Sequence, residues 1–148
     1  MQLETPIRDI MTTHLTTVAP DTSIKDIQDI FARNSFHHLP VTEPGSRLVG
    51  IISREDFRIF YQNLSANSSG PTWVRKQLEH RCAKDIMTAA PLSLDPDDTI
   101  GLAADIFLAN KFHALPVVED ELLMGILTTH DILAYSVGEG NLSEPVNR

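Results

Sequence analysis

Two pairs of residues in the chain combine a hydroxyl group with a carboxylate three positions later. Ser53 is followed by Asp56, and Thr128 is followed by Asp131, each pair coming just after a Gly-Ile dipeptide. An ionised carboxylate only accepts hydrogen bonds, and a hydroxyl at the start of a helix lies beside backbone N–H groups that lack a partner. Such a pair can form a capping box, which stabilises the helix and needs no ligand. The same groups can instead bind a ligand, and the residue types alone leave both interpretations open.

Other arrangements that could support catalysis or metal binding are missing from the sequence. It contains no Gly-x-Ser-x-Gly elbow and no glycine-rich phosphate loop. His14, His80 and His130 lack the paired spacing of metal ligands, so we expect surface histidines and no metal site. Cys82 is the single cysteine, which excludes an internal disulfide and agrees with a reducing compartment. We therefore expect no enzymatic activity and no catalytic cofactor.

The composition is that of one soluble globular domain with a substantial core. The chain has 148 residues, 42% of them hydrophobic, and a formal net charge of −8. Acidic proteins rarely bind nucleic acid, because affinity for phosphate backbones comes mainly from clustered Lys and Arg. The apolar stretches are too short to span a membrane, and the N-terminus carries charged residues where a secretory signal needs an apolar core. We expect a cytoplasmic protein that binds neither nucleic acid nor membrane.

The elements that position the two pairs come from an internal repeat. The tag Asp9–Thr12 (Asp-Ile-Met-Thr) returns as Asp85–Thr88, and the segment Phe36–Val41 returns as Phe112–Val117, both 76 positions later. The segments that hold the Ser53 and Thr128 pairs follow in the same order. A repeat of this length indicates that one supersecondary unit is present twice and buries itself against its copy. Two such units imply paired clefts.

Each repeat is predicted to be a strand, a helix, two strands and a second helix (βαββα). The hydrophobic spacing and the turn residues predict an α+β fold in which the two copies pack through their sheets. The predicted elements are extended segments 15–18 and 92–94, helices ending near Asn34 and Asn110, hairpins 39–52 and 115–127, and second helices from Ser53 to Tyr61 and from Thr128 to Tyr135. The predicted domains are repeat one at 1–66, a linker with a short helix at 67–81, repeat two at 82–136 and a flexible tail at 137–148.

The repeated motifs resemble those of a known family. The tag, the Phe-His-x-Leu-Pro-Val segment and the Gly-Ile-x-(Ser/Thr)-x-x-Asp segment are similar to a tandem pair of cystathionine β-synthase (CBS) domains, called a Bateman module. The resemblance runs from about Ile7 to Leu133, nearly the whole chain. It implies two repeats packed through their sheets, with clefts that bind AMP, ADP, ATP, S-adenosylmethionine or NAD-like molecules. It also implies that two modules associate into a homodimer.

The resemblance further implies roles for individual residues. Asp56 and Asp131 would accept hydrogen bonds from ribose hydroxyls, while Ser53 and Thr128 would contact ribose or phosphate. This fits the chemistry, because a carboxylate can accept from both hydroxyls of a cis-diol and a helix start favours phosphate. The residues implied to contact adenine, through backbone groups or as apolar walls, are Thr17, Val18, Ser93, Leu94, Ile10, Met11, Ile86, Met87, Pro40 and Pro116.

Three histidines precede the predicted hairpins. His37, His38 and His113 occupy positions that often carry His or Arg facing phosphates in related modules. An unperturbed histidine has a pKa of about 6.5, so phosphate binding through it would strengthen as the pH falls. Exposed histidines at a strand edge are the alternative interpretation. Repeat two has Ala114 in place of His38, so we expect the two clefts to differ in affinity.

Two functions therefore remain open. The first is a non-catalytic sensor that binds an adenosine-containing ligand and transmits its occupancy to a regulated protein partner. The second is a protein-interaction module with vestigial, unoccupied clefts, which contacts a partner enzyme, channel or transporter.

Overall fold

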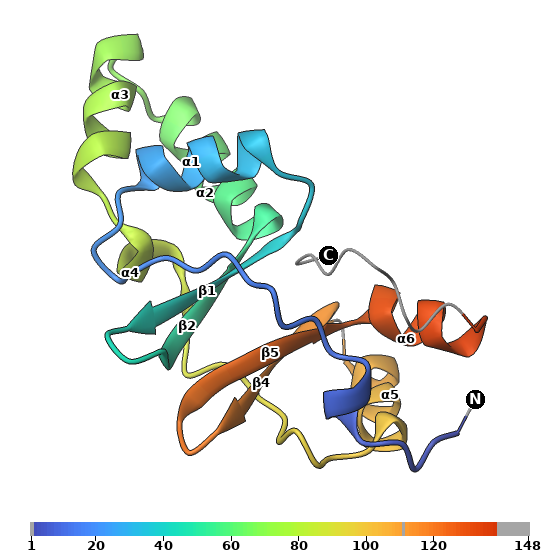
Figure 1. Cartoon of the computed structure of the whole chain (residues 1–148). Helices are drawn as coiled ribbons and strands as arrows, with labels where there is room; N and C mark the ends of the chain where they lie inside the picture. Colours follow the sequence, from blue (N-terminus) through green and yellow to red (C-terminus); the bar gives the residue numbers. More distant parts are fainter. Residues whose placement is uncertain (1, 111, 139–148) are drawn as a thin grey trace. The chain divides into compact units, whose positions relative to one another are not determined.

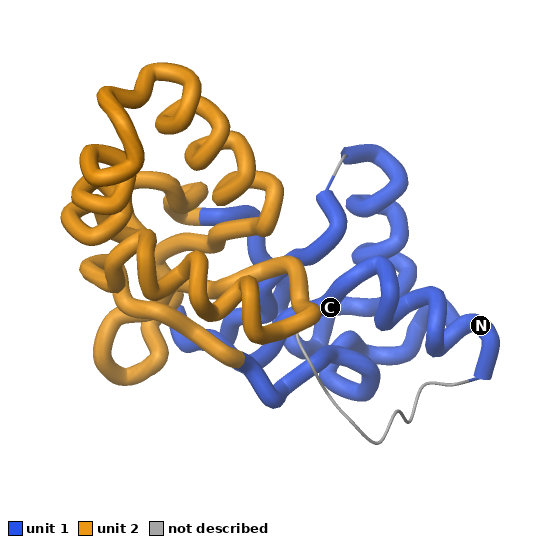
Figure 2. The backbone as a smooth tube through the Cα atoms, turned by 90° about the horizontal axis from the view of Figure 1, so that it is seen from above, with its two compact units in different colours: residues 1–15, 91–148 blue, residues 16–90 orange. Residues whose placement is uncertain are grey.

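The computed structural model describes residues 2–110 and 112–138 of the chain (Figure 1). It mixes helices with antiparallel hairpins, which confirms the predicted α+β class. The chain forms two compact units: unit 2 is Thr16–Ala90, and unit 1 combines Met1–Leu15 with Pro91–Arg148 (Figure 2). None of the helices in the described ranges is long and apolar enough to cross a membrane. From residue 139 onward, the predicted flexible tail lies outside the described residues.

Unit 2 is built on a hairpin with helices packed beside it (Figure 1). Strand β2 pairs antiparallel with both β1 and the short β3. The elements are α1 (Ile24–Arg33), β1 (His38–Glu43), β2 (Arg47–Ser53), α2 (Arg54–Ala66), α3 (Pro71–His80), α4 (Ala83–Ile86) and β3 (Thr88–Ala89). Helix α3 lies within residues 67–81, the predicted linker; it starts with a proline, whose fixed φ suits the first helical position.

Unit 1 repeats the helix, hairpin and helix of unit 2. Strands β4 and β5 form an antiparallel hairpin, as predicted. The elements are the 3-10 helix η1 (Ile7–Asp9), α5 (Ile100–Ala109), β4 (Ala114–Glu119), β5 (Leu122–Thr128) and α6 (Thr129–Ser136). Helices α1 and α5 begin at equivalent caps, where Ser23 accepts a hydrogen bond from the N–H of Asp26 and Thr99 accepts one from the N–H of Leu102. Both helices end where the sequence predicted.

The extended segments before α1 and α5 are not regular strands. Val18 forms a single bridge with Val41, and Leu94 forms a single bridge with Val117. The short strands predicted at 15–18 and 92–94 are therefore limited to one bridge residue each. Pro20 and Pro96 follow two residues after the bridges, and proline cannot donate a backbone hydrogen bond that would extend the pairing.

Each Asp-Ile-Met-Thr tag packs on the hairpin of the other repeat. Thr12 and Ile126 exchange two backbone hydrogen bonds of 2.9 Å, so the first tag lies beside β5. Thr88 pairs with Ile51 in the same way, so the second tag lies beside β2. Each compact unit therefore combines the tag of one sequence repeat with the helices and hairpin of the other.

The glycine of each Gly-Ile dipeptide lets an Asp-Ile-Met-Thr tag lie close to the backbone of β2 or β5. A Cβ atom on Gly125 would lie 2.8 Å from Sδ of Met11 and 2.8 Å from the carbonyl oxygen of Thr12. A Cβ on Gly50 would meet Sδ of Met87 and would lie 3.0 Å from the carbonyl oxygen of Thr88. Real Cβ atoms do not approach a backbone oxygen as closely as 2.8 Å, so only glycine fits at position 125, while at position 50 a side chain would require the Met87 side chain to move.

The Gly125→Ala variant is expected to lose about 1–3 kcal/mol of unfolding free energy, the usual cost of overpacking a tight contact. The Met11 side chain can move, but the Thr12 carbonyl is backbone and is fixed by its bond from Ile126. Adding Met11→Ala should restore only part of the loss. Urea unfolding of the two variants beside the parent measures this, and a Gly125→Ala variant as stable as the parent would contradict the close approach.

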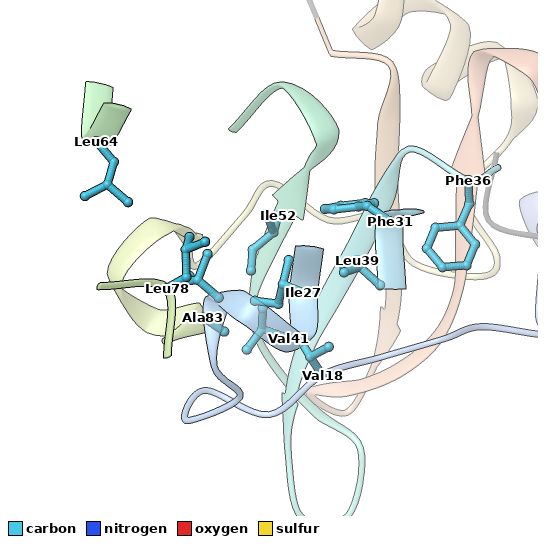
Figure 3. Packing of buried hydrophobic residues seen from close by; sticks show 11 residues of the cluster. Val18, Ile27, Phe31, Phe36, Leu39, Val41, Ile52, Leu64, Leu78 and Ala83 are labelled. Atoms are coloured by element: carbon cyan, nitrogen blue, oxygen red, sulfur yellow. The ribbon is translucent and has the colours of Figure 1, made fainter. Parts of the chain in front are cut away.

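Each unit has its own hydrophobic core. In unit 2, Ile27 and Phe31 of α1 lie against Leu39 and Val41 of β1, with Ile52 of β2 beside them (Figure 3). Leu78 of α3 joins this cluster, so the linker helix is part of the core. The buried cluster of unit 1 consists of Ile7, Leu94, Ala103, Leu115, Val117 and Leu127.

Candidate functional site

Ser53 and Asp56 form a capping box at the start of α2. Oγ of Ser53 accepts a hydrogen bond of 3.0 Å from the N–H of Asp56, and Oδ2 of Asp56 accepts one of 2.9 Å from the N–H of Ser53. The pair therefore forms the capping box that its residue types allowed. Asp56 is half-buried, and within residues 2–110 and 112–138 no group donates to its Oδ1 atom. One carboxylate oxygen remains available for a further donor.

Thr128 and Asp131 form the equivalent box at the start of α6. Oγ1 of Thr128 accepts a bond of 3.1 Å from the N–H of Asp131, and Oδ2 of Asp131 accepts one of 2.9 Å from the N–H of Thr128. The hydroxyl of Thr12, a buried tag residue, also donates to Asp131, at 3.2 Å from Oδ1 and 3.4 Å from Oδ2. Asp131 therefore holds both its own helix start and the tag of the other repeat.

The surroundings of Asp131 change its acidity. Burial raises the pKa of the Asp131 carboxyl above its ordinary value. Hydrogen bonds from Thr128 and Thr12 and the nearby His130 act in the opposite direction but are outweighed. Asp131 consequently takes up a proton at a higher pH than an exposed aspartate does.

The residues implied to contact adenine are divided between the units in matching sets. Unit 2 holds Thr17, Val18, Pro40, Ile86 and Met87, and unit 1 holds Ser93, Leu94, Pro116, Ile10 and Met11. Because the tags are exchanged, the methionine of each set comes from the tag of the other repeat.

In each unit, the residue that forms the isolated bridge before the first helix already uses its backbone N–H and carbonyl in hydrogen bonds. The N–H of Val18 donates to the carbonyl of Pro40 at 3.1 Å, and the carbonyl of Val18 accepts from Thr42 at 2.9 Å. Leu94 makes the same two bonds, with Pro116 at 2.9 Å and Val118 at 2.8 Å. The neighbouring residues Thr17 and Ser93 are exposed. An adenine edge would therefore have to use Thr17 and Ser93, or the second lone pair of the Val18 and Leu94 carbonyls.

The hairpins bring the histidine segments to the capping boxes. His38 lies opposite Ser53 in the β1–β2 pairing, and Ala114 lies opposite Thr128 in the β4–β5 pairing. His37 and His113 are exposed one residue earlier in the chain. We use the name Asp56 set for Asp56, Ser53, His37 and His38, and the name Asp131 set for Asp131, Thr128 and His113.

Sequence reasoning missed two residues that contact these sets. Thr12 was read only as part of the tag, and 119 positions separate it from Asp131, so no local spacing could connect them. Arg54, next to Ser53, was not singled out. The repeat alignment contained a signal, because repeat two has Thr129 at the equivalent position.

The described residues hold no group of three or more His, Cys, Asp or Glu side chains that could bind a metal ion. Cys82 is half-buried at the start of α4, where its N–H donates to Oδ2 of Asp85 at 2.9 Å. Burial raises the pKa of the Cys82 thiol, so the reactive thiolate is disfavoured. Asp85 therefore caps α4 in the same way that Asp56 caps α2.

Comparison of the sequence with protein families identifies two copies of one domain. Residues 7–63 and 83–138 match the CBS domain. Protein MJ1426 from Methanocaldococcus jannaschii is 30% identical over 149 residues, which cover 86% of this chain and 88% of that protein. Protein MJ1225 from the same organism is 32% identical over 130 residues, which cover 87% of this chain and 46% of that protein.

Some relatives are much longer than this chain. The chain spans only 21% of an inosine-5′-monophosphate dehydrogenase from Aquifex aeolicus, with 29% identity over 118 residues. It likewise spans less than half of MJ1225. The similarity to these proteins is thus limited to one portion of them.

Solved structures agree with the sequence matches. The structure of CBSX2 from Arabidopsis thaliana in complex with AMP superposes with a TM-score of 0.75 and 28% identity, covering 89% of this chain and 96% of that chain. The structure of MJ1225 gives a TM-score of 0.77 and 28% identity, covering 92% of this chain and 49% of that chain. The chain therefore belongs to the CBS domain family and carries two CBS domains in tandem.

Proposed function

We propose that this protein is a non-catalytic regulatory module that binds an adenosine-containing ligand, such as AMP, ADP or ATP, and transmits its occupancy to a protein partner. The observation that carries the proposal is the state of Asp56. Its carboxylate is half-buried at a helix start and has an oxygen beyond the one that caps the helix. The similarity to CBSX2, which was solved with AMP, supports an adenosyl ligand.

The chemistry of each set suits a nucleotide. The carboxylates of Asp56 and Asp131 accept from the ribose hydroxyls, since an ionised carboxylate has room for several donors. Ser53 and Thr128 stand at the starts of α2 and α6, where backbone N–H groups and the helix dipole favour phosphate. His37, His38 and His113 add imidazole N–H donors on the phosphate side.

The tags provide a route by which occupancy changes the protein. Met87 precedes β3 and packs over Gly50 of β2, so a ligand that contacts Met87 also acts on the pairing of the tag with β2. Met11, over Gly125, is placed in the same way beside β5. A ligand that prefers one arrangement of a tag shifts the population toward it, and this differential affinity is the signal.

Thermal unfolding with AMP, ADP, ATP, S-adenosylmethionine and NAD tests the proposal. A ligand that binds only the folded protein stabilises it by about 2.7 kcal/mol at a hundredfold excess over its dissociation constant. We expect at least one of the five compounds to raise the melting temperature in a concentration-dependent manner. The absence of a shift with all five would favour the alternative function below.

The alternative is an interaction module whose candidate sites hold no ligand. Apolar side chains on the second helix of each repeat favour it: Ile59 of α2 is 47% exposed and Leu133 of α6 is 63% exposed. Such surface suits a second copy of the chain, and we propose a homodimer under either function. Light scattering that gives a monomer at micromolar concentration would contradict the homodimer.

A further inference from the structure

Arg54, the first residue of α2, is bound to the segment that joins α1 to β1. Its Nε donates to the carbonyl of Phe36 at 2.7 Å, and its Nη2 donates to the carbonyl of Phe31 at 2.8 Å and also to that of Asn34. Its backbone N–H donates to the carbonyl of His37 at 2.8 Å. One residue thus holds four carbonyls between the last turn of α1 and the first residue of β1, His38.

The guanidinium group is well suited to this position. Its donors form a fixed planar fork, and its charge lies where the C-terminal end of α1 presents partial negative charge. The group also lies over the ring of Phe31, 5.0 Å from its centroid. Phe36 packs edge-on against Phe31, with ring centroids 6.3 Å apart, and only 5% of it is exposed.

Among the described residues of repeat two, no side chain forms an equivalent clamp. Its equivalent residue, Thr129, keeps the backbone bond to the carbonyl of His113 at 3.0 Å. Within the described ranges, the Thr129 side chain makes no hydrogen bond to the segment before β4. Phe112, the counterpart of Phe36, is 42% exposed. The Phe-His segments therefore have the same sequence motif but are held differently.

We infer that Arg54 is a positioning residue for the phosphate side of the Asp56 set, holding the backbone of His37 and the start of β1 so that the two histidines are preorganised for a phosphorylated ligand. This inference rests on the proposed function. Arg54 acts through the histidine segment and not through contact with the ligand. The Asp131 set, with Thr129 and Ala114, discriminates less between a nucleotide and its nucleoside.

A comparison of AMP with adenosine separates positioning from a merely structural role. Both compounds carry the ribose and adenine, and only AMP carries the phosphate. Calorimetric titrations in an Asp131→Ala background monitor the Asp56 set alone. Arg54→Thr copies the residue of repeat two. It is expected to weaken AMP binding about five- to tenfold, because the side chains of His37 and His38 must then be ordered when the phosphate binds. Adenosine binding should weaken less than about twofold.

Arg54→Lys is the matched control. Lysine keeps the positive charge but cannot donate to three carbonyls with a fixed fork. If Arg54 acts by positioning, Arg54→Lys should lose AMP affinity as Arg54→Thr does. Retention of full AMP affinity by Arg54→Lys would mean that the charge alone matters, and this would overturn the inference.

Amide hydrogen exchange of the ligand-free protein, made without the Asp131→Ala change, gives a second readout. Exchange of the backbone N–H of residue 54, which donates to the carbonyl of His37 at 2.8 Å, is expected to accelerate about tenfold or more in Arg54→Thr, since the side-chain bonds that restrain the segment before β1 are lost. Unchanged exchange would overturn the clamp. The reciprocal variant Thr129→Arg should slow exchange of the backbone N–H of residue 129, which donates to the carbonyl of His113 at 3.0 Å.

The failure of the inference can be told apart from the failure of the proposed function. If the parent protein binds both compounds and the ratio of their affinities is unchanged in Arg54→Thr, the inference alone is overturned. An equal loss of AMP and adenosine affinity would also overturn it, because it would mark Arg54 as structural. If the parent binds neither compound, the proposed function fails and the inference fails with it.

Discussion

Asp56→Ala is expected to weaken adenosine binding by the Asp56 set about 100-fold or more. The variant removes the acceptor of both ribose hydroxyls, and hydrogen bonds to a charged group contribute about 1.5–3 kcal/mol each. Two such bonds correspond to a factor of 100 or greater in the dissociation constant. Calorimetric titration of adenosine in the Asp131→Ala background, with and without Asp56→Ala, measures the loss directly.

Asp85→Ala is the matched control for the loss of a cap. Asp85 accepts from the N–H of Cys82 at 2.9 Å, as Asp56 accepts from Ser53 at the same distance. Both variants should lose stability on the order of 1 kcal/mol, the usual value of a cap. Asp85→Ala should bind adenosine within about twofold of the parent. If Asp56→Ala also binds like the parent, the carboxylate serves only the capping box.

Binding at the Asp131 set is expected to weaken on acidification in a range set by the raised pKa of Asp131. A protonated carboxyl loses its charge and one acceptor position, so the ribose hydroxyls lose their partner. Below that pKa, the apparent affinity should fall about tenfold per pH unit, following the ionised fraction. Titrations of adenosine in the Asp56→Ala background at a series of pH values measure this. An affinity at this set that does not change with pH would contradict the assignment of Asp131.

The raised pKa of Asp131 also makes stability depend on pH. The direction is opposite to that of a salt-bridged aspartate, whose pKa is lowered and whose contribution to stability rises with pH. Between the unfolded value of about 3.9 and the higher folded value, the folded protein binds more protons than the unfolded chain. The contribution of Asp131 to stability therefore falls as the pH rises through this window. In Asp131→Asn this component is absent, so the stability of the variant relative to the parent should increase with pH. Urea midpoints of both proteins at several pH values provide the check.

Much of the fold could be predicted because its signals are local. The helix starts at Ser53 and Thr128 follow from a hydroxyl with an acid three residues later, and the helix ends at Asn34 and Asn110 follow from the end of the hydrophobic periodicity. The repeat itself gave the order of the elements and identified the two carboxylates as equivalent. Each of these features depends on residues a few positions apart.

The features that the sequence did not reveal depend on contacts between distant residues. Nothing in the spacing of Thr12 shows that its hydroxyl donates to Asp131, because the tags come to lie over Gly50 and Gly125 only in the folded chain. The clamp made by Arg54 spans about 20 positions and depends on the direction of one guanidinium group. The first strands were overestimated because the apolar residues around Val18 are also consistent with a single bridge.

The pairing of a ribose diol with the two helix-start carboxylates is tested most directly by comparing adenosine with 2′,3′-dideoxyadenosine in calorimetric titrations of the parent protein. The two compounds share the base and differ only in the hydroxyls that Asp56 and Asp131 would hold. We predict that the dideoxy compound binds at least about 100-fold more weakly than adenosine, since both hydrogen bonds to each carboxylate are lost. Equal binding of the two compounds would show that neither carboxylate holds the sugar.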